Sequence, residues 1–331
     1  MKNPINVCVY AVGGLGINLG PIFDRNRQAN GFDHVDVVYV DTSDANMNDA
    51  RLSGIGEDKI FRFPNLKGGG KDRRVLHPKI VPHIPDILRK FPPKTFNVVL
   101  HSSGGASGST VGPELVREML LRGLNVVVVQ VGASSDLTLL RNTIGTLLSY
   151  SDISKKTNRS VISWYSEITQ KTPQSNVDER ALSALFLLSV LLSNRNDRVD
   201  ATDLNNLLNY ERVTSFTPEF SSIEFFREEF NLPEYVIPQS MSLLVPEENV
   251  DQLGVPVEGL RVEYVSDGIL DPKFASSLGN KNLAALVYTG QFKRCVERLE
   301  EERSVYKREA EERNRASSRL EADSGEDGLI F

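Results

Sequence analysis

The sequence has little of what stabilises small secreted proteins or binds structural metals. It contains 2 cysteines and 4 histidines in 331 residues, and these are scattered along the chain. Two cysteines are too few for a disulfide framework, and they form no Cys/His spacing typical of a metal site. Cys8 lies inside an apolar run and is expected to be a small core residue. This cysteine usage favours a protein of a reducing cytosol.

Long apolar segments are also lacking. The longest, 181–192, is shorter than the roughly 20 residues that span a bilayer, and two serines interrupt it. The N-terminus has no basic segment followed by a long apolar one, so we expect no secretory signal. The net charge of −6 gives no general attraction to nucleic acid or acidic membranes. We therefore expect a cytoplasmic protein without membrane contact.

The first half of the chain alternates strand and helix patterns. Short runs rich in Val and Ile predict buried parallel strands at 5–10, 35–40, 96–100, 126–131 and 160–164. Helices are expected between them, at 18–30, 79–90, 111–122 and 136–155. This order predicts an α/β fold with a Rossmann-like, doubly wound domain, in which ligands bind at the carboxyl ends of the strands.

The most informative segment is 101–113, which reads His-Ser-Ser-Gly-Gly-Ala-Ser-Gly-Ser-Thr-Val-Gly-Pro. It lies between a predicted strand and a predicted helix. Small residues in such a turn leave backbone N–H groups bare and let a ligand approach closely. The start of a helix adds partial positive charge, so the turn is a candidate phosphate site. A flexible Gly/Ser linker is the alternative, and the flanking elements argue against it.

Two further segments are rich in glycine. Residues 11–18 resemble the start of a dinucleotide fingerprint, although Asn18 stands where the third glycine is expected. Asp41 lies a suitable distance downstream, which leaves an NAD-type hypothesis open. In 67–74, three glycines lie beside four basic residues that could wrap an anion. Taken alone, that last segment is more typical of a solvated surface loop.

The second half of the chain changes in texture. Nearly every face of 182–192 is apolar, so the helix predicted there should be a buried central helix. Several prolines and short alternating runs then predict a smaller α+β domain. A run of mixed charge predicts a long solvated helix, followed by an acidic tail with an apolar end. The predicted units are 1–175, 176–211, 212–290, 291–320 and 321–331.

The order of these turns resembles the loop series of the tubulin and FtsZ superfamily, and within it the phage tubulins of the PhuZ family. Residues 104–109 resemble the tubulin signature loop, with Ala106 replacing a usual glycine and Ser107 standing where FtsZ and many tubulins have Thr. Residues 199–204 match the family's catalytic D-x-x-D loop, and the acidic tail is similar to that of PhuZ proteins. From spacing alone, Asp200 is more simply explained as a helix cap, and Arg198 has no assigned role.

The resemblance implies a GTPase whose active site is completed by the adjacent subunit, through Asp200 and Asp203. Mg²⁺ would be held mainly by the phosphates of GTP, without a firm protein ligand. Asp136 would reach the ribose, and Asn176 and Asp178 would read the base. The full set of implied GTP-binding residues is Gly13, Gly14, Leu15, Gly16, Asn18, Asp44, Asn46, Gly68, Gly69, Gly70, Ser103, Gly104, Gly105, Ala106, Ser107, Gly108, Ser109, Asp136, Asn176 and Asp178.

The resemblance also implies partners. Subunits would polymerise head to tail, and a tail containing Asp323, Glu326 and Asp327 would contact the neighbouring subunit. The filament would position the phage nucleus or DNA, or move capsids, in the host bacterial cytoplasm through factors that the sequence does not identify. The alternatives are a plasmid-partition-type tubulin, a GTP-dependent filament protein that does not hydrolyse GTP and, more distantly, a Rossmann NAD oxidoreductase.

Overall fold

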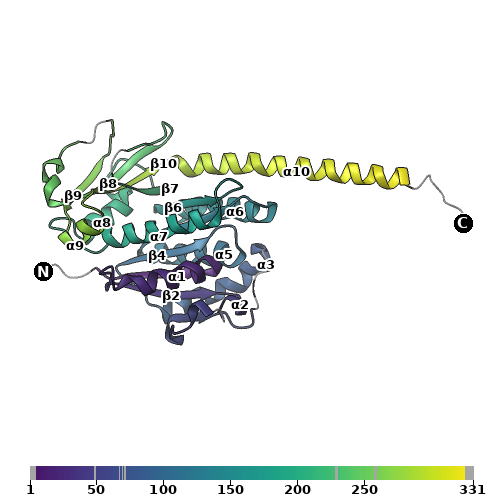
Figure 1. Cartoon of the computed structure of the whole chain (residues 1–331), viewed down its shortest axis with the longest axis horizontal. Coiled ribbons are helices and arrows are strands. Elements are labelled where there is room, and N and C mark those ends of the chain that lie inside the picture. Colours follow the sequence, from purple (N-terminus) through teal and green to yellow (C-terminus); the bar gives the residue numbers. More distant parts are fainter. Residues whose placement is uncertain are drawn as a thin grey trace, which may run out of the picture.

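The chain is built around one ten-stranded sheet with helices on both faces (Figure 1). The structure, a computed structural model, describes residues 5–47, 50–66, 68, 70, 72–227, 230–256 and 259–324, with the backbone alone at 44, 47 and 314–324. The strand order is β3-β2-β1-β4-β5-β6-β7-β10-β8-β9. This arrangement confirms the predicted α/β, doubly wound fold.

The first six strands of the sheet are parallel. They are β1 (Val7–Val12), β2 (Val35–Asp41), β3 (Ile60–Arg62), β4 (Phe96–Ser102), β5 (Asn125–Ala133) and β6 (Val161–Ile168). Val and Ile dominate them because parallel strands are covered on both faces. The predicted strands are confirmed, and β3 is an addition that the sequence pattern did not reveal.

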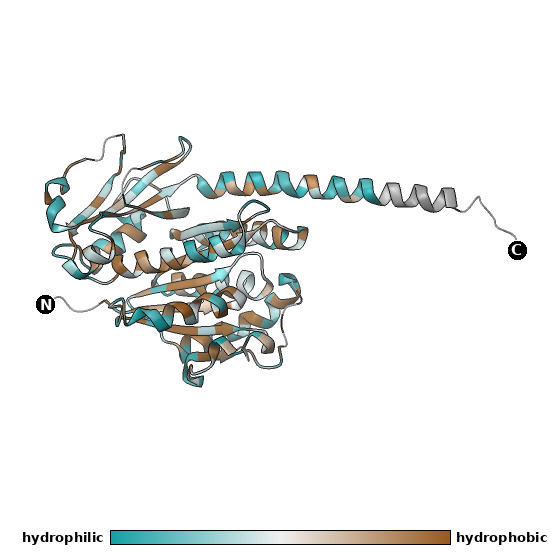
Figure 2. Cartoon of the chain, viewed as in Figure 1, coloured by the Kyte–Doolittle hydropathy of each residue, from teal (hydrophilic) through white to brown (hydrophobic). Residues whose placement is uncertain are grey.

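Two hydrophobic cores lie on the two faces of this half. Val7 and Val9 of β1 pack with α1 (Gly13–Arg27) and α7 (Gln174–Leu191). The intervening Cys8 and Tyr10 face the opposite core, as alternation along a strand requires. That second core is covered by α3 (Arg73–Ile80), α4 (Ile84–Lys90), α5 (Ala106–Leu121) and α6 (Leu137–Thr157). Figure 2 shows the strands of this half mainly in the hydrophobic colour.

Several helices begin or divide elsewhere than predicted. α1 begins at Gly13 rather than at 18, and α5 begins at Ala106 rather than at 111. The glycine segments are therefore largely the first turns of helices. The single helix expected at 79–90 is instead α3 and α4 joined by a 3₁₀ turn at Val81–His83, where Pro82 cannot donate an i→i−4 hydrogen bond.

The sheet continues into the second half of the chain. β7 (Phe220–Phe226) pairs in parallel with β6, and β10 (Leu283–Thr289) lies antiparallel between β7 and β8 (Ile237–Val245). β9 (Tyr264–Ile269) completes this edge, and α8 (Ala201–Leu208) packs on β8 and β9. α9 (Pro272–Ser277) also lies in this half, whose strands continue the sheet of the first half, whereas α2 (Asp44–Met47) follows β2 in the first half.

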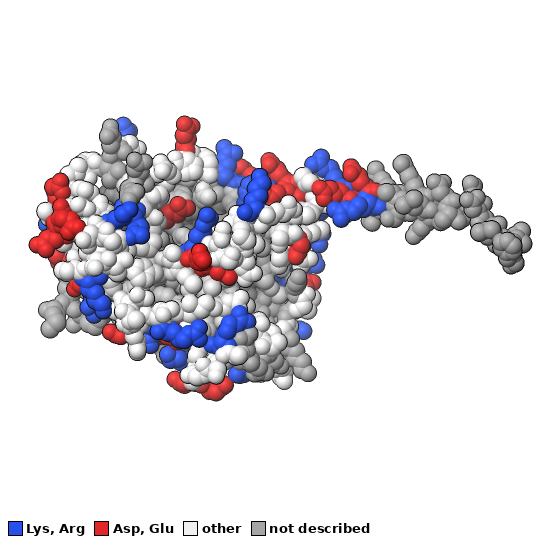
Figure 3. Space-filling model, viewed as in Figure 1, with Lys and Arg blue, Asp and Glu red and all other residues white. Residues whose placement is uncertain are grey.

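The last helix, α10 (Gln291–Ser324), extends from the body as a long arm and passes the predicted end at 320 (Figure 1). Its first half is held to the body by Arg298, which pairs with Glu167 at 2.5 Å, and by Tyr306, which donates to the carbonyl of Ser134 at 3.0 Å. Charges of both signs follow one another along it (Figure 3). Within the described residues, no helix combines the length and apolar character needed to cross a bilayer.

Candidate functional site

Two helix starts lie side by side at the carboxyl edge of the sheet. β1 and β4 are paired neighbours, and they lead directly into α1 and towards α5. A Cβ atom placed on Gly13 would lie 2.9 Å from the backbone nitrogen of Gly108, so the two turns are in contact. Gly13 also has a φ of +69°, which glycine adopts without steric cost. Glycine at position 13 is thus required twice, by the conformation and by the contact.

Within the described residues, no side chain caps α1 or α5, and neither helix has an acidic residue in its first turn. By contrast, Asp72, Asp136 and Asp200 cap α3, α6 and α8 by accepting backbone N–H groups. The first N–H groups of a helix have no partner within it, and the helix dipole adds positive charge there. Two adjacent bare helix starts therefore form a candidate anion site.

Asp41 organises the loop that follows β2. Its Oδ1 accepts from the N–H groups of Thr42 at 2.6 Å and Ser43 at 3.2 Å, and its Oδ2 accepts from Asn46 Nδ2 at 2.7 Å. The Asn46 amide faces the α1 turn, 3.7 Å from where a Cβ of Gly14 would lie. Asp41 is 1% exposed, and both of its oxygens are used inside the loop. It is therefore not placed to bind a ribose, which removes the acidic residue that the NAD-type hypothesis needs.

The loop after β2 also contacts the other glycine segments. The hydroxyls of Thr42 and Ser107 form a hydrogen bond of 2.7 Å. A Cβ on Gly68, whose φ is +106°, would lie 3.8 Å from the Cβ of Ser43. Gly13, Gly14, Ser107, Gly108 and Gly68 are thus brought near one another and near the loop after β2, at one edge of the sheet.

A row of polar residues on α6 supports the signature turn from behind. Asn142 Nδ2 donates to the carbonyl of Gly104 at 2.9 Å, and Thr146 donates to the carbonyl of Ser103 at 3.1 Å. Thr143 bonds both backbone groups of Ala133, at 3.0 and 3.1 Å. These supporting residues were not predicted from the sequence. Their only signal there is polar residues on a helix face that is otherwise apolar.

Some of the predicted residues belong to the framework of the site. Ser103 is fully buried, and its hydroxyl donates to Gln130 at 2.6 Å while its N–H donates to the carbonyl of Val131 at 2.8 Å. The Ser109 hydroxyl is also buried and donates to the carbonyl of Ala106 at 3.2 Å. These hydroxyls hold the turn in shape. Leu15 and Gly16 pack against the core, and Asn18 accepts a hydrogen bond from Arg51.

The two residues predicted to read the base point to different sides of α7. Asn176 lines a hollow of about 530 Å³ together with Trp164 and Glu224. Asp178, two positions further along the helix, accepts from Gln174 at 3.4 Å with Oδ2. Its Oδ1 is buried and finds no hydrogen-bond partner among the described residues. Burial raises the pKa of this carboxyl group.

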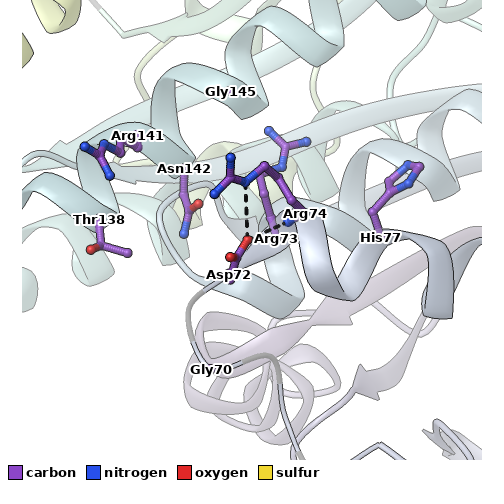
Figure 4. A pocket seen from close by; sticks show the side chains of 9 residues that line it. All are labelled: Gly70, Asp72, Arg73, Arg74, His77, Thr138, Arg141, Asn142 and Gly145. Carbon is purple, nitrogen blue, oxygen red and sulfur yellow. Dashed lines mark hydrogen bonds and ion pairs between the residues drawn. The ribbon is translucent and has the colours of Figure 1, made fainter.

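A basic cavity of about 980 Å³ lies between α3 and α6 (Figure 4). Arg73, Arg74 and Arg141 line it, while Asp72 is its one carboxylate among the described residues. Arg73 donates to Ser149 at 3.0 Å, and its burial lowers the pKa of its guanidinium group. Gly70 and Asn142 also line this cavity, so it adjoins both the third glycine segment and the signature turn.

The predicted acidic pair forms the start of α8, after the central helix. Asp200 Oδ1 accepts from the N–H groups of Thr202 at 2.7 Å and Asp203 at 3.2 Å, and Asp203 Oδ2 accepts from the Asp200 N–H at 3.0 Å. This reciprocal capping box confirms the helix-cap explanation of Asp200. Arg198 pairs with Asp197 at 3.2 Å and with Asp267 at 3.7 Å.

Several predictions fall outside the described residues. They concern Gly69, the side chains of Asp44 and Asp323, and the tail residues Glu326 and Asp327. In the part of the chain that the structure describes, His, Cys, Asp and Glu side chains do not gather in threes or more that could hold a metal ion.

A doubly wound sheet, two bare helix starts and an acidic pair after a central helix define the class of tubulin-like folds.

Comparison with known proteins agrees with this class. No family model matches the chain. It is 33% identical over 205 residues to a phage tubulin-like protein of Pseudomonas phage PhiPA3, covering 62% of this chain and 61% of that protein. It is 32% identical over 220 residues to a phage tubulin-like protein of Pseudomonas phage phiKZ, covering 64% of this chain and 65% of the relative. The chain thus spans less than two thirds of either relative.

A solved structure extends the likeness over nearly the whole fold. The protofilament of TubZ from bacteriophage PhiKZ is 26% identical, with a TM-score of 0.81 and 92% of each chain covered. The chain belongs to the tubulin and FtsZ superfamily, and the relatives described above are phage tubulins.

Proposed function

We propose that this protein binds and hydrolyses GTP and polymerises head to tail into a cytoskeletal filament. The observation that carries the proposal is the contact between two uncapped helix starts at Gly13 and Gly108. This arrangement presents two sets of bare N–H groups to one anion, which suits the adjacent phosphates of a nucleotide. The similar solved structure is a protofilament, which supports assembly through end-to-end contacts.

The glycine segments fit a nucleoside triphosphate. The first turns of α1 and α5 would hold phosphate oxygens, and Gly68–Gly70 would close over the terminal phosphate. Mg²⁺, when bound, neutralises charge on the phosphates and takes most of its ligands from them and from water. The Thr42 and Ser107 hydroxyls lie at the same edge and would complete the polar lining there.

Asp178 supplies the best support for guanine as the base. Its buried Oδ1 lacks a partner among the described residues, and the N1–H and N2–H₂ groups of guanine are donors that a carboxylate can accept. Adenine has no N–H at position 1 and offers only its exocyclic N6 amino group, so it cannot present the adjacent pair of donors that guanine offers a carboxylate. The ribose would lie near Asp136. Asn176 points towards Trp164 and Glu224, so we assign base recognition to Asp178 first.

Hydrolysis would require two subunits. Asp200 and Asp203 follow the central helix, and we propose that they meet the nucleotide of the next subunit and orient the attacking water. A contact between two different surfaces of the same chain does not close on itself, so it generates a filament. Assembly would then switch hydrolysis on. A filament protein that binds GTP without hydrolysing it remains the alternative that the experiment below separates.

The basic cavity between α3 and α6 is a candidate receptor for the acidic tail of a neighbouring subunit. Three arginines face one carboxylate there, and guanidinium groups bind carboxylates in paired hydrogen bonds. The predicted tail contributes Asp323, Glu326 and Asp327.

Since the relatives are phage proteins, we propose that the filament acts in the cytoplasm of an infected bacterium and positions phage DNA, the phage nucleus or capsids.

The proposal is tested by light scattering and phosphate release, measured with GTP, GDP, ATP and NAD. We expect GTP alone to drive assembly, and phosphate release to rise steeply above a threshold protein concentration. Asp200→Asn is the sharp variant, because Asn caps a helix as well as Asp but carries no charge. It should assemble with GTP and release almost no phosphate. Wild-type rates in this variant, or retention of NAD in place of GTP, would contradict the proposal.

A further inference from the structure

Tyr264 of β9 contacts the start of α8, where Asp200 and Asp203 lie; we call residues 199–204 the acidic loop. Tyr264 pairs in register with Ser240 of β8, and Ser240 donates to the carbonyl of Leu207 in α8 at 2.7 Å. Tyr264 therefore lies on the face that α8 covers. Its hydroxyl donates to Asp203 Oδ1 at 3.0 Å.

The two aspartates stand in different surroundings. Asp203 is half-buried, and its two oxygens accept different hydrogen bonds, from the Tyr264 hydroxyl and from the Asp200 N–H. Asp200 is exposed at the outer end of the same helix start. Tyr264 thus holds one oxygen of the Asp203 carboxylate, the other oxygen holds the Asp200 N–H, and the Asp203 N–H in turn donates to Asp200 Oδ1 at 3.2 Å.

Tyr264 is suited to hold this arrangement permanently. Burial, and then the nearby Asp203 and Asp200 carboxylates, raise the pKa of Tyr264 to about 12. The hydroxyl therefore keeps its proton at neutral pH and donates to Asp203 Oδ1, which favours one orientation of that carboxylate.

We infer that Tyr264 is a positioning residue for the acidic loop, that Asp203 transmits its effect, and that Asp200 is the carboxylate presented to the neighbouring subunit. This inference rests on the proposed function and deepens it. It assigns different roles to two aspartates that the family motif treats as a pair. It also makes hydrolysis depend on a residue of β9, which lies at the edge of the sheet opposite β3.

The first test does not need GTP turnover. Hydrogen exchange of the segment 195–204 is measured on unassembled protein, for the wild type and for Tyr264→Phe. We expect the Asp200 N–H to exchange about tenfold faster in the variant, because Asp203 loses one of its two anchors. Tyr235→Phe is the matched control, since it removes a tyrosine hydroxyl that donates to Gln291 at 3.2 Å, away from α8. Unchanged exchange in Tyr264→Phe would overturn the inference.

The second test is phosphate release by assembled protein. Tyr264→Phe should lower the maximal rate about tenfold and leave the affinity for GTP unchanged, since the loop acts on a neighbour's nucleotide. In an Asp203→Ala background the same change should alter the rate by less than about twofold, because the partner is already gone. Additive effects would show a merely structural role and overturn the inference. A wild type that exchanges as expected but releases no phosphate would instead overturn the proposed function.

Discussion

The hydroxyl groups of Thr42 and Ser107 form a hydrogen bond of 2.7 Å, although the two residues are 65 positions apart in the chain. Thr42 follows β2, and Ser107 lies in the first turn of α5. The bond therefore fixes the loop after β2 against the turn that we propose to hold phosphate. Asp41 also fixes this loop, because its carboxylate accepts hydrogen bonds from the Thr42 N–H and from Asn46 Nδ2.

Removing either hydroxyl should weaken GTP binding. We expect Ser107→Ala and Thr42→Ala each to raise the Kd about fivefold, which corresponds to one net hydrogen bond of about 1 kcal/mol. The double variant should bind little worse than either single variant, because both remove the same bond. Titration calorimetry measures this, with Ser53→Ala at an exposed serine as the control. Fully additive losses would show that each hydroxyl contacts the ligand independently.

Gly13 should tolerate no side chain. Gly13→Ala combines a φ of +69° with an approach of 2.9 Å to the Gly108 nitrogen, so we expect at least about 1–3 kcal/mol of lost unfolding free energy and loss of GTP binding. Gly54→Ala is the control, because its φ is +85° but no atom lies within 4 Å of the added Cβ. Urea unfolding compares the two. Equal losses in both variants would mean that backbone strain alone accounts for the effect.

His101 should make the fold sensitive to acid. It is fully buried beside the Tyr150 hydroxyl, at 2.6 Å, and burial, followed by the charge of Arg73, lowers its pKa from 6.5 to about 4. Between these two pH values the unfolded chain binds a proton at His101 that the folded chain does not bind. Protonation of His101 therefore does not reduce the free energy of unfolding well above pH 6.5. As the pH falls from 6.5 towards 4, it lowers that free energy by roughly 3 kcal/mol.

The histidine effect is isolated by comparing unfolding free energies between pH 7.5 and 4.5. His101→Gln should be less stable at neutral pH and should lose less stability on acidification than the wild type. Parallel curves for the wild type and His101→Gln would contradict the assignment.

The acidic tail should lower the concentration needed for assembly. Removing 321–331 is expected to raise the threshold in light scattering, and Arg141→Ala in the basic cavity should raise it similarly. The two changes together should do no more than either alone. Arg89→Ala is the control, at an arginine that pairs with Asp86 outside the cavity at 2.8 Å. An unchanged threshold after truncation would count against tail docking.

Much of the parallel sheet could be predicted from the sequence, because strands covered on both faces need uninterrupted runs of Val and Ile. The starts of α1 and α5 could not. Glycine disfavours helices, so the pattern places Gly13 and Gly108 in loops. In the structure each glycine turn supports the other through close contact, which overrides local propensity.

The sequence predicts the separate segments of the candidate site, but not the hydrogen bonds that connect them. Local spacing finds Asp200 and the glycines, because their signals lie within a few residues. The supports, among them Asn142, Tyr264 and Asp41 as an anchor, act across long sequence separations. For the same reason the pattern did not reveal that β7 joins β6, a pairing that unites the predicted units in one sheet.

That pairing limits how the subunit can change shape. Residues 161–163 of β6 and 220–222 of β7 are hydrogen-bonded neighbours, so hinge-like swinging of one half against the other would break backbone bonds in the middle of the molecule. A conformational change that links the proposed phosphate site to β9 would therefore occur as a change in the twist of this continuous sheet, or as movement of the loops and helices packed on it. A pulling force along a polymer of such subunits would be distributed over the backbone hydrogen bonds of the whole sheet.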